Sequence, residues 1–170
     1  MDYFFLTMRL LHILFGVFWV GTIVFNAIFL GPSLREAGPA GSTVFAALVR
    51  RNFPIVLPIT AVINMLAGVY LLWKVSAGFQ PAYFHTATGM AFSSGALLAI
   101  AGFAIGIVVM RPAMLGAMSM GQAAAQAPPA ERDQMLARAK ALGLRAAKAS
   151  RIIAMLLTLA VAAMAVGRYV

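Results

Sequence analysis

Long apolar stretches alternate with short polar segments along this chain of 170 residues. Four stretches lack Asp, Glu, Lys and Arg, namely 10–34 with 25 residues, 55–73 with 19, 82–110 with 29 and 152–167 with 16. A membrane-spanning helix needs roughly 20 mostly apolar residues. Arg151 and Arg168 flank the short fourth stretch, and such side chains can extend along the helix to the bilayer boundary. We therefore predict an all-α integral membrane four-helix bundle, with spans at about 8–31, 54–74, 83–110 and 150–168.

The composition agrees with a membrane protein. Hydrophobic residues make up 63% of the chain and charged residues 10%, with a mean hydropathy of +0.94. A soluble domain is roughly 45–50% apolar and 25% charged, so an ordinary soluble or disordered protein is excluded. The first apolar stretch is longer than the roughly 7–15 residues of a signal-peptide core, and we expect it to remain in the mature protein. The chain has no cysteine, which excludes disulfides and thiolate metal sites.

The distribution of charge predicts the orientation in the membrane. Ten of the 13 Lys and Arg residues lie between spans one and two or between spans three and four, whereas Arg9, Lys74 and Arg168 lie on the other side. Because basic residues are retained in the cytoplasm, we expect both termini outside a bacterial-type inner (plasma) membrane. The formal charge of +9 then reflects topology and attraction to anionic lipid head groups, and not binding of nucleic acid.

Glycine and proline mark the expected ends of the helices. Gly31-Pro32 is expected to end the first span, and residues 43–51 can form a short amphipathic helix at the membrane surface. The third span need not stop at Arg111, and the next break comes at Pro128-Pro129. We predict an extended cytoplasmic hairpin at about 111–149, either projecting from the bilayer or bent flat along it at Gly143.

Polar groups within the spans are few, and such groups usually face the bundle or a cavity. No carboxylate lies within a span, which leaves His12 and His85 as the main candidates for chemistry. Both lie near the outer end of their spans, and each begins the tetrad His-x-x-x-Gly, with Gly16 and Gly89. Two imidazoles that face each other suit a haem iron or a soft divalent metal, and each glycine leaves room for a flat macrocycle. The alternative is that each histidine bonds to water or head groups at the boundary.

Four further features allow a structural or a functional interpretation. Trp19 lies near the middle of its span and is either core packing or the wall of a cofactor pocket. Asn64 is expected to hydrogen-bond between helices. Met8 and His12, four residues apart, form a candidate soft-metal pair. A row of methionines also invites a copper interpretation, although an apolar hairpin face explains it more simply; it consists of Met110, Met114 and Met118.

The first span carries a short motif, Leu11-His12, six residues, then Trp19-Val20-Gly21. This motif resembles the first-helix signature of the copper-resistance D (CopD) family, and the HemJ-type protoporphyrinogen oxidases have a similar opening. The resemblance covers about residues 10–21 and implies a small helical membrane bundle that handles haem or copper, with His12 as the functional histidine. The chain departs from these families because its third span has no basic residue and large CopD proteins have more spans.

Three functions remain as hypotheses. The first is a membrane protein that binds haem b between His12 and His85, with Gly16, Trp19 and Gly89 shaping the pocket, for electron transfer or a haem-linked oxidation. The second is copper binding or transport through His12, His85 and Met8. The third is a non-catalytic membrane subunit or scaffold. The expected partners are the lipid bilayer, anionic lipid at the basic hairpin, and a second copy or a partner subunit.

Overall fold

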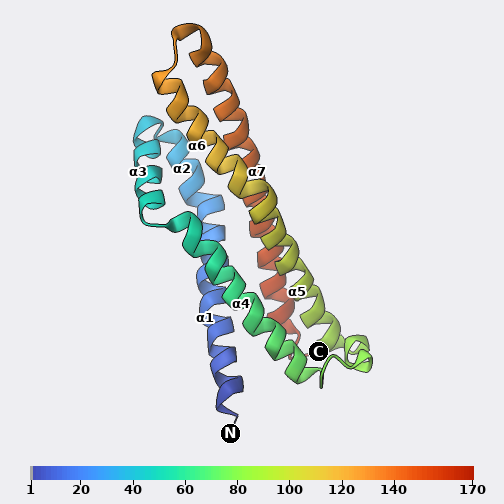
Figure 1. The fold of residues 1–170 in the computed structure, drawn as a ribbon. Coiled ribbons are helices and arrows are strands. Elements are labelled where there is room, and N and C mark those ends of the chain that lie inside the picture. Colours follow the sequence, from blue (N-terminus) through green and yellow to red (C-terminus); the bar gives the residue numbers. More distant parts are fainter. Residues whose placement is uncertain (1) are drawn as a thin grey trace.

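The computed structural model describes residues 2–170, and it is helical almost throughout, with no strand in that range (Figure 1). Four continuous helical stretches are long and apolar enough to cross a membrane, which indicates a multi-pass membrane protein. The elements in chain order are α1 (Tyr3–Phe25), η1 (Asn26–Leu30), α2 (Gly31–Glu36), α3 (Pro39–Arg50), α4 (Phe53–Val75), η2 (Pro81–His85), α5 (Ala87–Ile105), η3 (Gly106–Met110), α6 (Arg111–Gln126) and α7 (Pro129–Val166). The prediction of an all-α bundle with four spans is confirmed at this level.

The helices form two antiparallel hairpins. The first consists of α1 and α4, and the second consists of α5 and α6 packed along α7 (Figure 1). Contacts between the hairpins are fewer and run mainly from α1 and η1 to α7. Both chain ends lie at the same end of the molecule, and the α6–α7 turn lies at the opposite end (Figure 1).

Two π-helical turns, η1 and η3, each come directly before an X-Pro pair. In η1 the Gly31 N–H donates to the Asn26 carbonyl, and in η3 the Arg111 N–H donates to the Gly106 carbonyl, both five residues back. Proline has no N–H and its ring displaces the carbonyl four residues earlier, so a widened turn lets the helix continue. Helical structure therefore continues through Gly31-Pro32, the predicted end of the first span, to Glu36.

Among the segments that connect the spans, one predicted boundary differs from the structure, at the start of the third span. Gly38, at a φ of 56°, turns the chain into α3, which includes most of the predicted surface helix at 43–51. The expected third span at 83–110 begins as an α-helix only at Ala87. The residues before it form η2, and Thr86 is extended and caps α5 by accepting a hydrogen bond from the Gly89 N–H at 3.0 Å.

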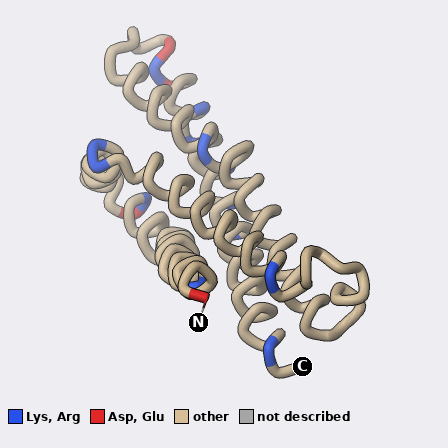
Figure 2. The backbone as a smooth tube through the Cα atoms, turned by 60° about the horizontal axis from the view of Figure 1, so that its bottom comes forward, with Lys and Arg blue, Asp and Glu red and all other residues tan. Residues whose placement is uncertain are grey.

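The longest helix, α7, continues without a break through Gly143. Its 38 residues extend about 57 Å at 1.5 Å per residue, whereas the hydrocarbon core of a bilayer is about 30 Å thick. The excess length pairs with α6 in a straight helical hairpin, and no bend lays it flat (Figure 1). Basic residues are spread along this hairpin and near α3, and the middle of the bundle carries few charges (Figure 2).

Large apolar side chains are exposed on the outside of the bundle. Val17 is 70% exposed and Leu97 67%, although both lie in the middle of long apolar helices. A soluble protein would bury such side chains, whereas lipid chains solvate them. The apolar core is small by comparison and is centred on Trp19, Leu57 and Leu157.

Candidate functional site

His12 lies on the face of α1 that packs against α4. Its Nδ1 lies 2.9 Å from the backbone carbonyl oxygen of Asn64, which can only accept, so Nδ1 carries the proton. The ring lies directly over Gly68, because a Cβ added there would come within 2.8 Å of the imidazole Cε1. A backbone carbonyl on one ring nitrogen is the usual support of a metal-binding histidine, and it leaves Nε2 unprotonated.

The side chain of Asn64 lies against Gly16, one turn along α1 from His12. It is 7% exposed, and its Oδ1 is buried with no hydrogen-bond partner among residues 2–170. A Cβ added at Gly16 would come within 3.0 Å of this oxygen. The residues Gly16 and Gly68 therefore let α1 and α4 approach closely around two polar side chains.

The second histidine belongs to the other hairpin. His85 is exposed in η2, which packs on α5, whereas His12 is half-buried against α4. Gly89 lies in the first turn of α5, where a side chain would collide with the carbonyl of Tyr83. The tetrad His-x-x-x-Gly is thus one α-helical turn at residues 12–16, and at 85–89 it crosses from a 3-10 turn into a helix. The two tetrads lie on different hairpins, with His12 on α1 against α4 and His85 in η2 against α5.

Metal-ligand clusters are sparse as well. Within the described residues no three His, Cys, Asp or Glu side chains come together as a metal site. Met8 and His12 are both partly exposed on α1, one turn apart. A site at this position would therefore rest on one imidazole and one thioether from the chain.

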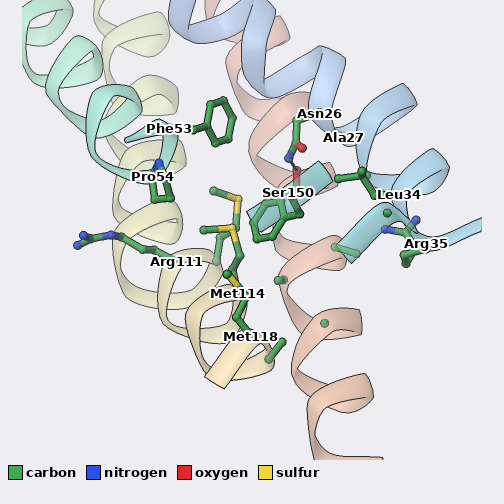
Figure 3. Close-up of a pocket in the computed structure, with 18 of the residues that line it drawn as sticks. Asn26, Ala27, Leu34, Arg35, Phe53, Pro54, Arg111, Met114, Met118 and Ser150 are labelled. Atoms are coloured by element: carbon green, nitrogen blue, oxygen red, sulfur yellow. Dashed lines mark hydrogen bonds between the residues drawn. The ribbon is translucent and has the colours of Figure 1, made fainter. Parts of the chain in front are cut away.

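A large cleft lies between the two hairpins, on the side of the molecule that carries α3. Its volume is about 1320 Å³, and its walls come from η1, α2, α3 and the start of α4 on one side and from η3, α6 and α7 on the other. Figure 3 shows Phe53 and Pro54 of α4, Leu34 and Arg35 of α2, and Met114 and Met118 of α6 around it. Typical small-molecule sites measure about 300–1,000 Å³, so the cleft is large enough for an elongated ligand.

The walls of the cleft are mainly apolar and carry charges of one sign only. Four basic side chains line it, and no Asp or Glu is among the described lining residues. The Nε atom of Arg111 is buried and has no hydrogen-bond partner within residues 2–170. The four basic residues are Arg35, Arg111, Lys140 and Arg151.

The inner end of the cleft reaches the core of the bundle at Trp19. The indole is 4% exposed and meets the Phe103 ring edge to face, with the centroids 6.3 Å apart and the planes at 79°. Nearby, Asn26 Nδ2 donates to Ser150 Oγ at 3.4 Å, which links η1 to α7 (Figure 3). The cleft therefore extends from the apolar middle of the bundle, past a polar pair, to Lys140 on the projecting hairpin.

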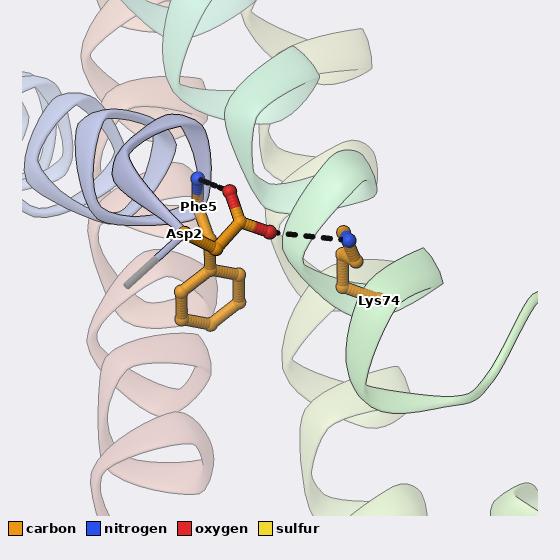
Figure 4. A network of polar contacts seen from close by, with 3 residues as sticks. All are labelled: Asp2, Phe5 and Lys74. Carbon is orange, nitrogen blue, oxygen red and sulfur yellow. Dashed lines mark hydrogen bonds and ion pairs between the residues drawn. The ribbon is translucent and has the colours of Figure 1, made fainter.

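At the other end of the first hairpin, an ion pair joins the start of α1 to the end of α4. Lys74 Nζ lies 3.2 Å from Asp2 Oδ2, while Asp2 Oδ1 accepts the Phe5 N–H at 3.0 Å and caps α1 (Figure 4). The Phe5 N–H and then the Lys74 ammonium hold the pKa of the Asp2 carboxyl below its usual value. This is the one ion pair within residues 2–170, so the basic residues of the cleft have no carboxylate partner there.

The cleft was not predicted as a site from the sequence. The pattern drew attention to Trp19, Met110, Met114 and Met118, and all four line the cleft. A further signal was available in Pro32 and Pro112 near the ends of spans one and three, since each follows a π-turn that lines the cleft. Comparison of the chain with protein-family models, curated proteins and solved structures gives no match.

Proposed function

We propose that this protein resides in a bacterial-type inner membrane, with both termini outside and the α6–α7 hairpin in the cytoplasm. The support is the excess of basic residues on the side of that hairpin. Exposed basic side chains on α7, such as Arg145 and Lys148, suit contact with anionic lipid head groups.

Its proposed function is to bind an amphiphile in the cleft between the two hairpins. One observation carries this proposal: a large apolar cleft reaches from Trp19 in the middle of the bundle to basic residues at the end that carries the α6–α7 hairpin. An amphiphile matches both parts, since its apolar body can lie against the inner walls and its polar group can lie among the arginines. The methionines of α6 suit such a site because their flexible side chains adapt to ligands of different shape.

The composition of the site favours binding over acid–base catalysis. No carboxylate lines the cleft, and neither histidine does. General acid–base chemistry needs a titratable side chain within hydrogen-bond reach of the reacting group. The Asn26–Ser150 pair and the arginines can orient a ligand, which is the role that they have in this proposal.

The absence of cysteine from the chain makes a direct test possible. Ala117→Cys would place one thiol on the cleft wall, and Ala137→Cys would place one on exposed α7 outside the lining residues. We expect vesicle lipids of phosphatidylethanolamine and phosphatidylglycerol to slow maleimide labelling of the Ala117→Cys variant relative to detergent-purified protein, with no such change in the Ala137→Cys variant. Equal protection of both thiols, or no protection in Ala117→Cys, would overturn the proposal.

A second candidate function is binding of haem or copper at His12. The supporting observation is the hydrogen bond from Nδ1 to the Asn64 carbonyl, which leaves Nε2 free to coordinate. The residues around His12 fit one axial ligand, and this candidate uses His12 alone because His85 is exposed on the other hairpin. A bound haem would supply one-electron transfer, and His12 and Gly68 would hold and orient it.

An optical spectrum separates this candidate from amphiphile binding. Protein purified from haem-replete cells should show a Soret band that His12→Ala removes and His85→Ala retains. Elemental analysis after copper loading gives the corresponding test for copper, with Met8→Leu as a second variant. A colourless, copper-free protein that purifies with a stoichiometric partner would instead favour a membrane subunit or scaffold.

A further inference from the structure

A second, smaller groove opens beside the cleft on the surface of the bundle. It measures about 310 Å³ and runs between α1 with η1 and α7. Two residues, Ala27 and Arg151, line both the groove and the cleft. The two cavities therefore meet at Arg151, the residue that directly precedes the apolar stretch of α7.

The groove is apolar and faces outward. Ile28 is 56% exposed and Met155 57%, and both lie in helices long enough to span a membrane. The hydroxyl of Thr158 donates to the Ala154 carbonyl at 2.8 Å, so the one polar side chain below Arg151 is already satisfied. A hydrocarbon chain is the occupant that such a surface accepts from the bilayer.

Three arginines of the cleft lack a counter-charge, and one of them, Arg151, lies at the junction of the two cavities. Arg35, Arg111 and Arg151 line the cleft, each near the end of a long apolar helix and on the same side of the predicted bilayer. None of them pairs with a carboxylate in the described part of the chain. Arginine binds phosphate through two parallel hydrogen bonds, and this geometry suits a phosphodiester at head-group depth.

We infer that the amphiphile is an anionic two-chain phospholipid. Its phosphate lies between Arg35 and Arg151, one acyl chain enters the cleft toward Trp19, and the other lies in the groove between Val24 and Leu159. This inference rests on the proposed binding function of the cleft and adds the class of ligand and its orientation. It also explains why the two cavities meet at an arginine.

Fluorescence quenching tests the inference, because the chain has only two tryptophans. In the variant Trp73→Phe, Trp19 at the inner end of the cleft is the sole emitter. This variant is placed in phosphatidylcholine nanodiscs that contain a small fraction of lipid with brominated acyl chains. We expect brominated phosphatidylglycerol to quench Trp19 several-fold more than the same fraction of brominated phosphatidylcholine.

Charge variants identify the head-group site. Arg151→Gln and Arg35→Gln should abolish the preference for phosphatidylglycerol, while Arg151→Lys, which keeps the charge, should retain part of it. Arg138→Gln is the matched control, since Arg138 is exposed on α7 and lines neither cavity. Unchanged preference in the Arg35 and Arg151 variants would overturn the inference.

The same measurement separates this inference from the proposed function. Equal quenching of Trp19 by both brominated lipids would mean that lipid enters the cleft without selection of the head group, so the inference would fail and amphiphile binding would stand. Quenching of Trp19 by neither lipid would overturn both.

Discussion

The contacts inside each hairpin and the contacts between the two hairpins are built from different residues. Inside the hairpins, glycines bring helices together: Gly68 lies against the His12 ring, and Gly95 lies against Ala160 and Met164 of α7. Between the hairpins the main contact is a cluster of larger side chains around Trp19, and beyond it the helices diverge around the cleft.

This difference is consistent with the physics of membrane proteins. Lipid tails are as apolar as leucine, so helices associate through close packing and hydrogen bonds more than through the hydrophobic effect. Glycine seams supply that close packing within each hairpin. The contact between the hairpins consists of one side-chain cluster beside an open cleft. This arrangement leaves room for a ligand, and it lets the position of one hairpin relative to the other change more easily.

The largest expected effect is at the contact between the hairpins. Trp19→Ala removes a nearly buried indole and its contact with Phe103, which should cost about 3–5 kcal/mol of stability because a cavity remains. We expect a much lower midpoint of thermal unfolding in detergent, followed by size-exclusion chromatography. Trp73→Ala is the control, since Trp73 is 45% exposed. Similar losses in both variants would contradict the assignment of Trp19 as the main inter-hairpin contact.

A somewhat smaller effect is expected within the second hairpin. Gly95→Leu would push a side chain into Met164 Cγ, 2.9 Å from the added Cβ, and toward the Ala160 carbonyl, so we expect a loss of about 3 kcal/mol. Gly121→Leu is the matched change on the cleft wall, where nothing lies within 4 Å of an added Cβ. The same unfolding assay should show little loss for Gly121→Leu, and an equal loss would mean that the cleft is as tightly packed as the hairpin seams.

The hydropathy pattern was enough to predict the helices but not how they pair. Uncharged stretches of the right length predict spans, and the break predicted at Pro128-Pro129 is where α7 begins. The end of the first helix was missed because proline usually stops a helix. At Pro32 the π-turn relieves the clash at little cost, and no hydropathy pattern reports such a turn.

The candidate site could be predicted only in part for a related reason. Helical spacing shows which residues share a face, so it grouped Met114 with Met118 on α6. It does not show which helix that face meets. The two histidines had similar depth in the predicted topology, yet α1 pairs with α4 and η2 pairs with α5, which places them on different hairpins. Pairing depends on side-chain fit between helices, as at Gly68 and His12, and one sequence does not display that fit.

A moderate effect is expected at the seam of the first hairpin. Gly68→Ala places a methyl group 2.8 Å from His12 Cε1, so the ring must move away from the Asn64 carbonyl, at a cost of about 1–2 kcal/mol. Gly21→Ala on α1 is the matched control, with nothing within 4 Å of an added Cβ. The shift of the unfolding midpoint and the NMR chemical shifts of a ring-labelled His12 should both change in Gly68→Ala alone. Unchanged His12 resonances in that variant would show that the ring does not lie on Gly68.

The smallest effect is expected at the exposed ion pair that closes the same hairpin. The pKa of the Asp2 carboxyl is lowered by the Phe5 N–H and by Lys74, so the ionised form is favoured in the folded state. Its contribution to stability is therefore present above the ordinary value of 3.8 and is lost as the pH falls through the lowered pKa. Exposed pairs contribute little, so we expect a slight fall of the unfolding midpoint on acidification, reduced in Asp2→Asn. Other carboxyl groups titrate over the same range, and the difference between wild type and variant isolates Asp2.

Lys74→Gln should reduce the acid-side change less than Asp2→Asn does, because the bond from the Phe5 N–H to the carboxylate remains. If the two variants have the same effect, the ion pair and not the helix cap holds α1 against α4 at this end.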